Sequence, residues 1–137
     1  MQPARLLLAD RNRHVREFLK RELATEGYTV VTASSAQEIL AALGGGEKFD
    51  LLILDLEVPY VVEANLLPQL QTFYPSLAIL IHAFQPDNPQ SLAAWQNAVF
   101  LEKNEDPARL KETVAALLQA REKGSGTREQ AGEPGCT

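Results

Sequence analysis

Residues 51–56 read LLILDL, with Asp55 as the one charged side chain in the stretch. A run that is apolar almost throughout is typical of a central parallel strand that helices cover on both faces, because neither face meets water. The sequence therefore predicts a buried strand that ends at an aspartate, in the middle of a sheet.

Similar runs on both sides of this stretch predict further strands. They are RLLLA at 5–9, YTVVTA at 28–33, LAILI at 77–81 and a brief strand at 99–101. The segments between them have helical spacing or helix-start signals. These predict five helices. The first carries Val15 and Leu19 inward, the second begins at the capping box of Ser35 and Glu38, and the third spans 65–73. The fourth begins at Asn88-Pro89, and the fifth runs from Asp106-Pro107 to about Arg121.

Five strands that alternate with five helices predict repeated right-handed βαβ units in one parallel sheet. No Gly-rich G-x-G-x-x-G turn follows the first strand, which disfavours a dinucleotide-binding arrangement. We therefore expect an α/β fold: a flavodoxin-like, doubly wound, five-stranded parallel sheet of order 2-1-3-4-5 with five helices. Ligands of such sheets bind where the winding reverses, at the carboxyl ends of strands 1 and 3.

The length of 137 residues leaves room for one domain, which we place at 1–122. Residues 123–137 (KGSGTREQAGEPGCT) are polar and Gly-rich, and we expect a flexible carboxyl-terminal tail. These 15 residues are too few for a DNA-binding module, so for a protein that consists of this chain alone we expect the output to be binding or phosphoryl relay.

Composition and charge exclude several classes of function. The formal net charge of −5 argues against direct binding of nucleic acid, which needs a clustered excess of Lys and Arg. The apolar stretches fall far short of the roughly 20 residues that cross a bilayer, and no charged-then-apolar leader opens the chain. Cys136 is the single cysteine, so no disulfide forms within the chain. We expect a cytoplasmic protein without membrane contact.

Two aspartates converge at the predicted crevice, since Asp10 ends the first strand and Asp55 the third. Carboxylates placed together repel, and a shared proton, an ammonium or a hard cation such as Mg²⁺ relieves the repulsion. Lys103, directly after the fifth strand, can reach the same crevice. An aspartate, a metal and a lysine together form a site for phosphoryl transfer.

Two segments resemble the receiver domain of bacterial two-component response regulators. They are RLLLADRNRHVREFLKRELATEGYTVVTAS and FDLLILDLEVP, and the similarity covers about residues 5–118. The resemblance implies that Asp55 is the phosphoacceptor, that Lys103 is the family's lysine and that Phe100 is its aromatic switch residue. It also implies that Asp10 and Asp55 hold Mg²⁺, and that the partner is a histidine kinase or another signalling protein.

Several residues depart from the family's pattern. Arg11 stands where receivers usually have a second acidic metal ligand, so we predict that it disrupts the site and that Mg²⁺ binding is weak or absent. Arg11 could form a bidentate fork with Asp55 or point into solvent. His82 replaces the Ser or Thr that contacts the phosphoryl group, and a contact with Asp55 that responds to pH is conceivable. The side chain of Glu57 could restore negative charge to the metal site. Val62-Glu63 and Gln96-Asn97 replace other family residues.

Plainer roles remain open for some of these residues. Asp10 could cap the first helix, and Phe100 is expected to be a core aromatic more than a moving switch. Trp95 could be buried or could contact a partner.

Three functions therefore compete. The leading hypothesis is an atypical receiver, impaired in Mg²⁺-dependent phosphorylation, that acts through protein–protein contact and is not an enzyme beyond self-phosphorylation. The resemblance also implies a homodimer through the face of the fourth helix, fifth strand and fifth helix. The second hypothesis is a working phosphoacceptor. The third, a flavodoxin-like cofactor carrier, needs a hydroxyl-rich phosphate loop, which DRNRH at 10–14 does not supply.

Overall fold

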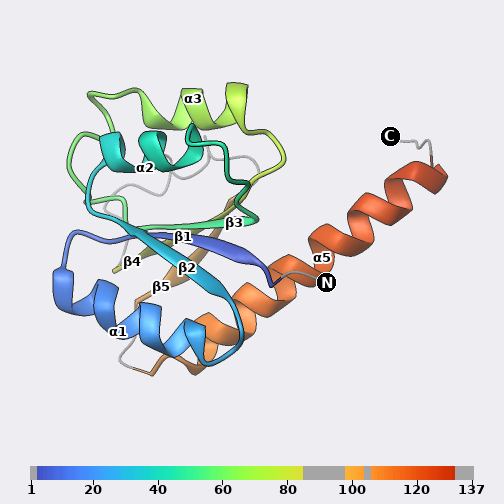
Figure 1. The fold of residues 1–137 in the computed structure, drawn as a ribbon, viewed down its shortest axis with the longest axis horizontal. Helices are drawn as coiled ribbons and strands as arrows, with labels where there is room; N and C mark the ends of the chain where they lie inside the picture. Colours follow the sequence, from blue (N-terminus) through green and yellow to red (C-terminus); the bar gives the residue numbers. More distant parts are fainter. Residues whose placement is uncertain (1–2, 85–97, 104–105, 132–137) are drawn as a thin grey trace.

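The structure is a computed structural model that describes residues 3–84, 98–103 and 106–131, with backbone alone from residue 121 on. Its elements lie in one α/β domain (Figure 1). In chain order they are β1 Arg5–Ala9, α1 Arg13–Ala24, β2 Thr29–Ala33, α2 Ala36–Leu43, β3 Leu51–Leu54, α3 Leu66–Phe73, β4 Ala78–Ala83, β5 Ala98–Glu102 and α5 Ala108–Ala131.

All five strands form one parallel sheet of order β2-β1-β3-β4-β5. This confirms the predicted order and fold class. The described residues contain four of the five expected helices. The helix expected to open at Asn88-Pro89, with Trp95 in it, lies outside the described residues, as do Gln96 and Asn97.

Helices cover both faces of the sheet, α2 and α3 on one face and α1 and α5 on the other (Figure 1). Successive residues of β3 alternate between the two layers, as the pleat of a strand requires. Leu52 and Leu54 pack in the core under α2 and α3, whereas Leu51 and Ile53 pack in the core under α1 and α5. All four side chains are fully buried, which explains why LLIL carries no polar residue.

The ends of several elements differ from the predicted ones. β3 ends at Leu54 because the chain turns at once, with the Val58 N–H donating to the Asp55 carbonyl at 3.1 Å. β4 runs to Ala83, two residues further than expected. α2 starts as the capping box predicts, with Ser35 Oγ accepting from the Glu38 N–H.

α5 continues to Ala131, ten residues beyond the predicted end at Arg121. Glycine is compatible with helical backbone angles and only costs about 1 kcal/mol relative to alanine, so Gly124 and Gly126 do not end the helix. The predicted irregular segment from Lys123 on therefore differs from the structure up to Ala131, and the flexibility of that tail stays a prediction. Over the part of the chain that is described, no helix has the length and apolar character to cross a membrane.

Candidate functional site

Asp10, Asp55 and His82 lie side by side at the carboxyl end of the sheet. The register pairs Ala9 with Leu54 and Leu54 with Ile81, so the next residue of each segment falls at the same level. Asp10 and Asp55 are each 1% exposed and His82 is 5% exposed. The buried acidic centre that we predicted at the switch point of the sheet is therefore present, with the histidine beside it.

Lys103 binds both aspartates. Its Nζ lies 2.8 Å from Asp10 Oδ2 and 3.3 Å from Asp55 Oδ2, and its side chain is 10% exposed. Its position is fixed because its backbone N–H donates to the Ala83 carbonyl at 2.8 Å, directly beyond the pairing of β5 with β4. The ring centre of Phe84 lies 5.4 Å from the same Nζ, within the range of a cation–π contact. The ammonium thus compensates the two buried carboxylates at once.

Backbone N–H groups also donate to both carboxylates. Asp55 Oδ1 accepts from the Glu57 N–H at 3.0 Å, and Asp55 Oδ2 accepts from the Arg11 N–H at 3.3 Å. Asp10 Oδ1 accepts from the Asn12 N–H at 2.8 Å. Asp10 is therefore held in one orientation by the loop after β1 and by Lys103, and Asp55 by the loops after β1 and β3 and by Lys103.

Arg11 lies over the site and contacts two acidic side chains. Its Nη1 donates to Glu57 Oε1 at 3.0 Å, while its Nε lies 3.9 Å from Asp55 Oδ2. The expected bidentate fork on Asp55 is wrong, because Glu57 takes one end of the guanidinium. The alternative of a side chain that simply points into solvent is also wrong, although Arg11 is 48% exposed. Glu57 therefore brings negative charge to the site, but that charge is paired with Arg11.

The first helix is capped by Asn12 and not by Asp10. Asn12 Oδ1 accepts from the N–H groups of His14 and Val15, at 2.9 and 3.2 Å. Asp10 lies too far ahead of the helix for this role, and its carboxylate faces Lys103 instead. Arg16 of α1 also reaches back, with Nη1 donating to the Asp10 carbonyl at 2.7 Å.

His82 is enclosed and neutral near pH 7. Burial lowers its pKa to about 4, and the nearby charge of Lys103 acts in the same direction, while Asp10 and Asp55 oppose the shift. Its buried Nδ1 has no hydrogen-bond partner among the described residues. The suggested change of charge near neutral pH is therefore wrong, because this pKa lies well below that range.

Phe100 is 37% exposed, so the expected core role is wrong. Among the described strands, β5 is an edge strand that pairs with β4 alone and has no fully buried residue, which leaves Phe100 and its neighbour Val99 partly in contact with water. Whether Phe100 acts as a switch stays a prediction. Val62, in place of a family aspartate, is 85% exposed.

The side chains as they lie do not fit a hydrated Mg²⁺. Within the described ranges, no group of three His, Cys, Asp or Glu side chains is arranged to hold a metal ion. Asp10 and Asp55 both turn an oxygen to Lys103, and the Glu57 carboxylate turns to Arg11. Mg²⁺ needs oxygen ligands in near-octahedral arrangement, and here ammonium and guanidinium groups hold those oxygens.

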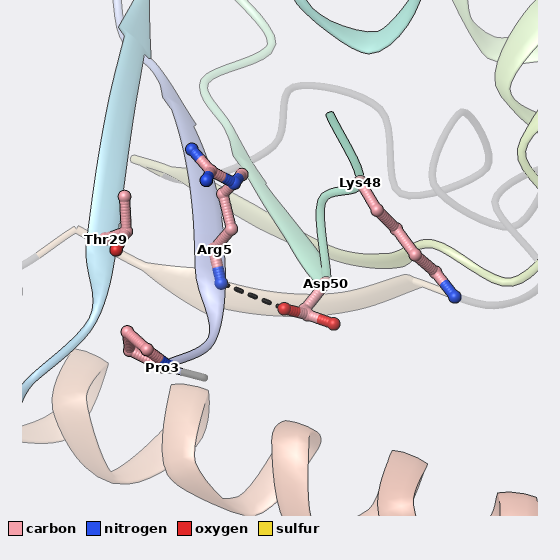
Figure 2. A pocket seen from close by; sticks show the side chains of 5 residues that line it. All are labelled: Pro3, Arg5, Thr29, Lys48 and Asp50. Atoms are coloured by element: carbon pink, nitrogen blue, oxygen red, sulfur yellow. Dashed lines mark hydrogen bonds between the residues drawn. The ribbon is translucent and has the colours of Figure 1, made fainter. Parts of the chain in front are cut away.

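A pocket of about 470 Å³ lies at the amino ends of the strands, opposite the acidic site (Figure 2). Arg5, Thr29 and Asp50 mark the amino ends of β1, β2 and β3 there, and the Asp50 carboxylate accepts from the Arg5 N–H at 2.9 Å. The side chains of Arg5 and Lys48 point away from each other in Figure 2, so they do not converge on a ligand. Ligands of doubly wound sheets bind at the opposite, carboxyl edge, which is where Asp55 lies.

Comparison with known proteins identifies the family of the chain. A family model described as the response regulator receiver domain matches residues 6–115. The transcriptional regulatory protein GlrR of Escherichia coli (strain K12) is 36% identical over 99 residues, which make up 72% of this chain and 22% of that protein. The chain thus spans about a fifth of the length of this curated relative.

Solved structures agree in fold. A CheY-like response regulator receiver domain protein from Methanospirillum hungatei JF-1 is 26% identical, with a TM-score of 0.79 over 89% of this chain and 98% of that one. The response regulator TrrA from Thermotoga maritima, in complex with Mg(2+)-BeF, is 29% identical, with a TM-score of 0.74 over 83% of this chain and 98% of that one. With the family model spanning nearly the whole sheet, the chain belongs to the response regulator receiver domains of two-component systems.

Proposed function

We propose that this chain is an atypical receiver in which Mg²⁺-dependent phosphorylation of Asp55 is impaired, and that it signals through protein–protein contact. The observation that carries the proposal is Arg11, whose guanidinium lies 3.9 Å from Asp55 Oδ2 where receivers usually have an acidic metal ligand. Asp10 and Lys103 keep two further groups of the receiver's site.

An arginine in place of an acidic ligand at residue 11 is expected to lower the affinity for Mg²⁺ strongly. Two unit charges about 4 Å apart interact by about 4 kcal/mol at an effective dielectric constant near 20. Losing an attraction of that size corresponds to roughly a thousandfold in affinity, and Arg11 adds repulsion. The neutral His82 also lacks the hydroxyl that contacts the phosphoryl group in the family.

The partners follow from family membership. Receivers meet histidine kinases, and we propose that this domain contacts such a kinase or another signalling protein in the cytoplasm. We further propose a homodimer through β5 and α5, supported by the exposed Val99 and Phe100 of the edge strand. GlrR is named a transcriptional regulator, but the net charge of −5 supports an expectation that this domain itself does not bind nucleic acid.

A working phosphoacceptor is the second candidate. It is favoured by the contact of Lys103 with Asp55, which is intact at 3.3 Å, and by the likeness to TrrA, whose structure contains Mg(2+)-BeF. In that case Mg²⁺ would bind Asp10 and Asp55, with Glu57 as a further source of negative charge. In neither case does the domain turn over a separate substrate, beyond its own phosphorylation and dephosphorylation.

The test compares the natural chain with Arg11→Asp by intact mass after incubation with acetyl phosphate, with and without Mg²⁺. We expect Mg²⁺ to raise the rate of phosphoryl gain at least about tenfold in Arg11→Asp, because each restored charge interaction is worth more than about 1.4 kcal/mol. The same Mg²⁺ should change the rate of the natural chain little. Asp55→Asn, the control, should gain nothing.

Strong Mg²⁺-dependent labelling of the natural chain would contradict the proposal. The conventional phosphorylation switch would then replace it.

A further inference from the structure

Two side-chain cations flank Asp55. Lys103 Nζ lies 3.3 Å and Arg11 Nε lies 3.9 Å from the same oxygen, Asp55 Oδ2. The backbone N–H groups of Glu57 and Arg11, in the loops after β3 and β1, each donate a hydrogen bond to one oxygen of this carboxylate. The nucleophile of a receiver is therefore oriented here by the chain itself, and positive charge stands next to it.

Positive charge beside the acceptor is what phosphoryl transfer requires. Negative charge spreads over the three equatorial oxygens of the phosphoryl group in the transition state, and enzymes neutralise it with metal ions, lysines or arginines. A single arginine placed on these oxygens contributes about 10³- to 10⁵-fold in nucleotide hydrolases. The planar guanidinium can donate two parallel hydrogen bonds to two phosphoryl oxygens, which suits it to this task better than a lysine ammonium.

The exposure of the two residues fits this role for Arg11. Asp55 is 1% exposed beneath the half-exposed Arg11, so a donor meets the guanidinium before it meets the carboxylate. Exposed side chains change rotamer within nanoseconds, so movement of Arg11 onto a donor does not limit a slow chemical step.

We propose that Asp55 accepts a phosphoryl group from an acyl phosphate without a divalent cation, with Arg11 and Lys103 supplying the positive charge. An oxygen of the Asp55 carboxylate attacks phosphorus, and the bond from phosphorus to the acyl oxygen breaks. That bond's electron pair leaves with the carboxylate, acetate when the donor is acetyl phosphate. The product is an acyl phosphate on Asp55, and no proton is transferred. This inference rests on the proposed loss of Mg²⁺ dependence.

Glu57 competes with the donor for Arg11. Its carboxylate accepts from Arg11 Nη1 at 3.0 Å, and a phosphoryl group must displace it to use both edges of the guanidinium. Both side chains are about half exposed, and exposed ion pairs of this kind are weak. Removing the competing charge in Glu57→Gln therefore raises the rate of labelling, by about fivefold at most.

The experiment follows intact mass over time with acetyl phosphate and excess EDTA, which removes divalent ions. The natural chain gains one phosphoryl group, and Asp55→Asn gains none. Arg11→Met slows the gain at least about tenfold, while Arg11→Lys, which keeps the charge, retains part of the rate. Arg13→Met is the matched control: Arg13 is more exposed and pairs with Glu17, so its loss leaves the rate unchanged. Circular dichroism of each variant checks that the fold is intact.

No phosphoryl gain in EDTA overturns this inference. Labelling of Arg11→Met as fast as that of the natural chain also overturns it, because Arg11 would then merely cover the site. Either result leaves the proposed function standing if Mg²⁺ does not restore labelling. A natural chain that is labelled only with Mg²⁺ contradicts both.

Discussion

The imidazole of His82 is enclosed at the carboxyl end of β4, between the acidic centre and the start of α5. Burial lowers its pKa to about 4, whereas an unfolded histidine titrates near 6.5. Between these two values the unfolded chain binds the extra proton and the folded chain does not. The contribution of His82 to stability is thus present above about pH 6.5 and is lost as the pH falls toward 4.

Acidification from about pH 7 to about pH 5 should therefore lower the free energy of unfolding by about 2 kcal/mol through His82 alone. His82→Gln removes the titration, so its free energy of unfolding should fall less over the same interval. Urea unfolding of both proteins at the two pH values measures the difference. His14→Gln is the control, because His14 is the other histidine of the chain and is exposed. Equal pH dependence in His82→Gln and the natural chain would show that the imidazole is not the group concerned.

For single residues, the sequence predicts where charged groups gather but not how they pair. Asp10, Asp55 and Lys103 could be found because each follows a strand, and the carboxyl ends of parallel strands share one edge. The pairing of Arg11 with Glu57, the contact of Phe84 with Lys103 and the reach of Arg16 to Asp10 depend on side-chain rotamers. No spacing along the chain encodes a rotamer, so these contacts were missed.

The start of α1 links helix stability to the site. Asn12 accepts from two N–H groups of the first turn and donates its own N–H to the Asp10 carboxylate. Replacing an asparagine cap by alanine typically costs about 1 kcal/mol, because orphan N–H groups lose their acceptor. We expect Asn12→Ala to lower the free energy of unfolding by that amount, which urea unfolding shows as a lower midpoint with an unchanged m-value. Asn12→Ser, which keeps a capping oxygen, should stay close to the natural chain, and equal loss in both variants would contradict the capping role.

The elements themselves were predicted where periodicity is strong and less well at their ends. β1 has the predicted bounds because an apolar run stops at a charge. The sequence predicts α5 too short because glycines and polar residues often follow the end of a helix, whereas this helix continues through them to Ala131. β5 was recognised, but its edge position, and with it the exposure of Phe100, follows from the order of the sheet and not from five residues of sequence.

In the part of the molecule that the structure describes, β5 forms one edge of the sheet. Val99 and Phe100 are 39% and 37% exposed there, and a second copy that covers them would remove apolar surface from water. Sedimentation of the natural chain should therefore depend on concentration, and Phe100→Asp should shift it to monomer. Phe73→Asp is the matched control, since Phe73 is an even more exposed aromatic at the end of α3, on the other layer. A natural chain that sediments as a monomer at all concentrations would contradict the dimer.

The separation of the three central residues along the chain also governs when the site can exist. Asp10, Asp55 and Lys103 arrive from successive thirds of the sequence, and a ribosome adds about 5–20 residues each second. During synthesis the two aspartates are made before Lys103, so the site cannot be complete until β5 docks beside β4. Docking of β5 thus completes the sheet and also brings Lys103 to the two aspartates, whose charge it compensates. A kinase that senses Asp55 beside Lys103 would recognise finished molecules alone and pass over nascent or partly unfolded ones.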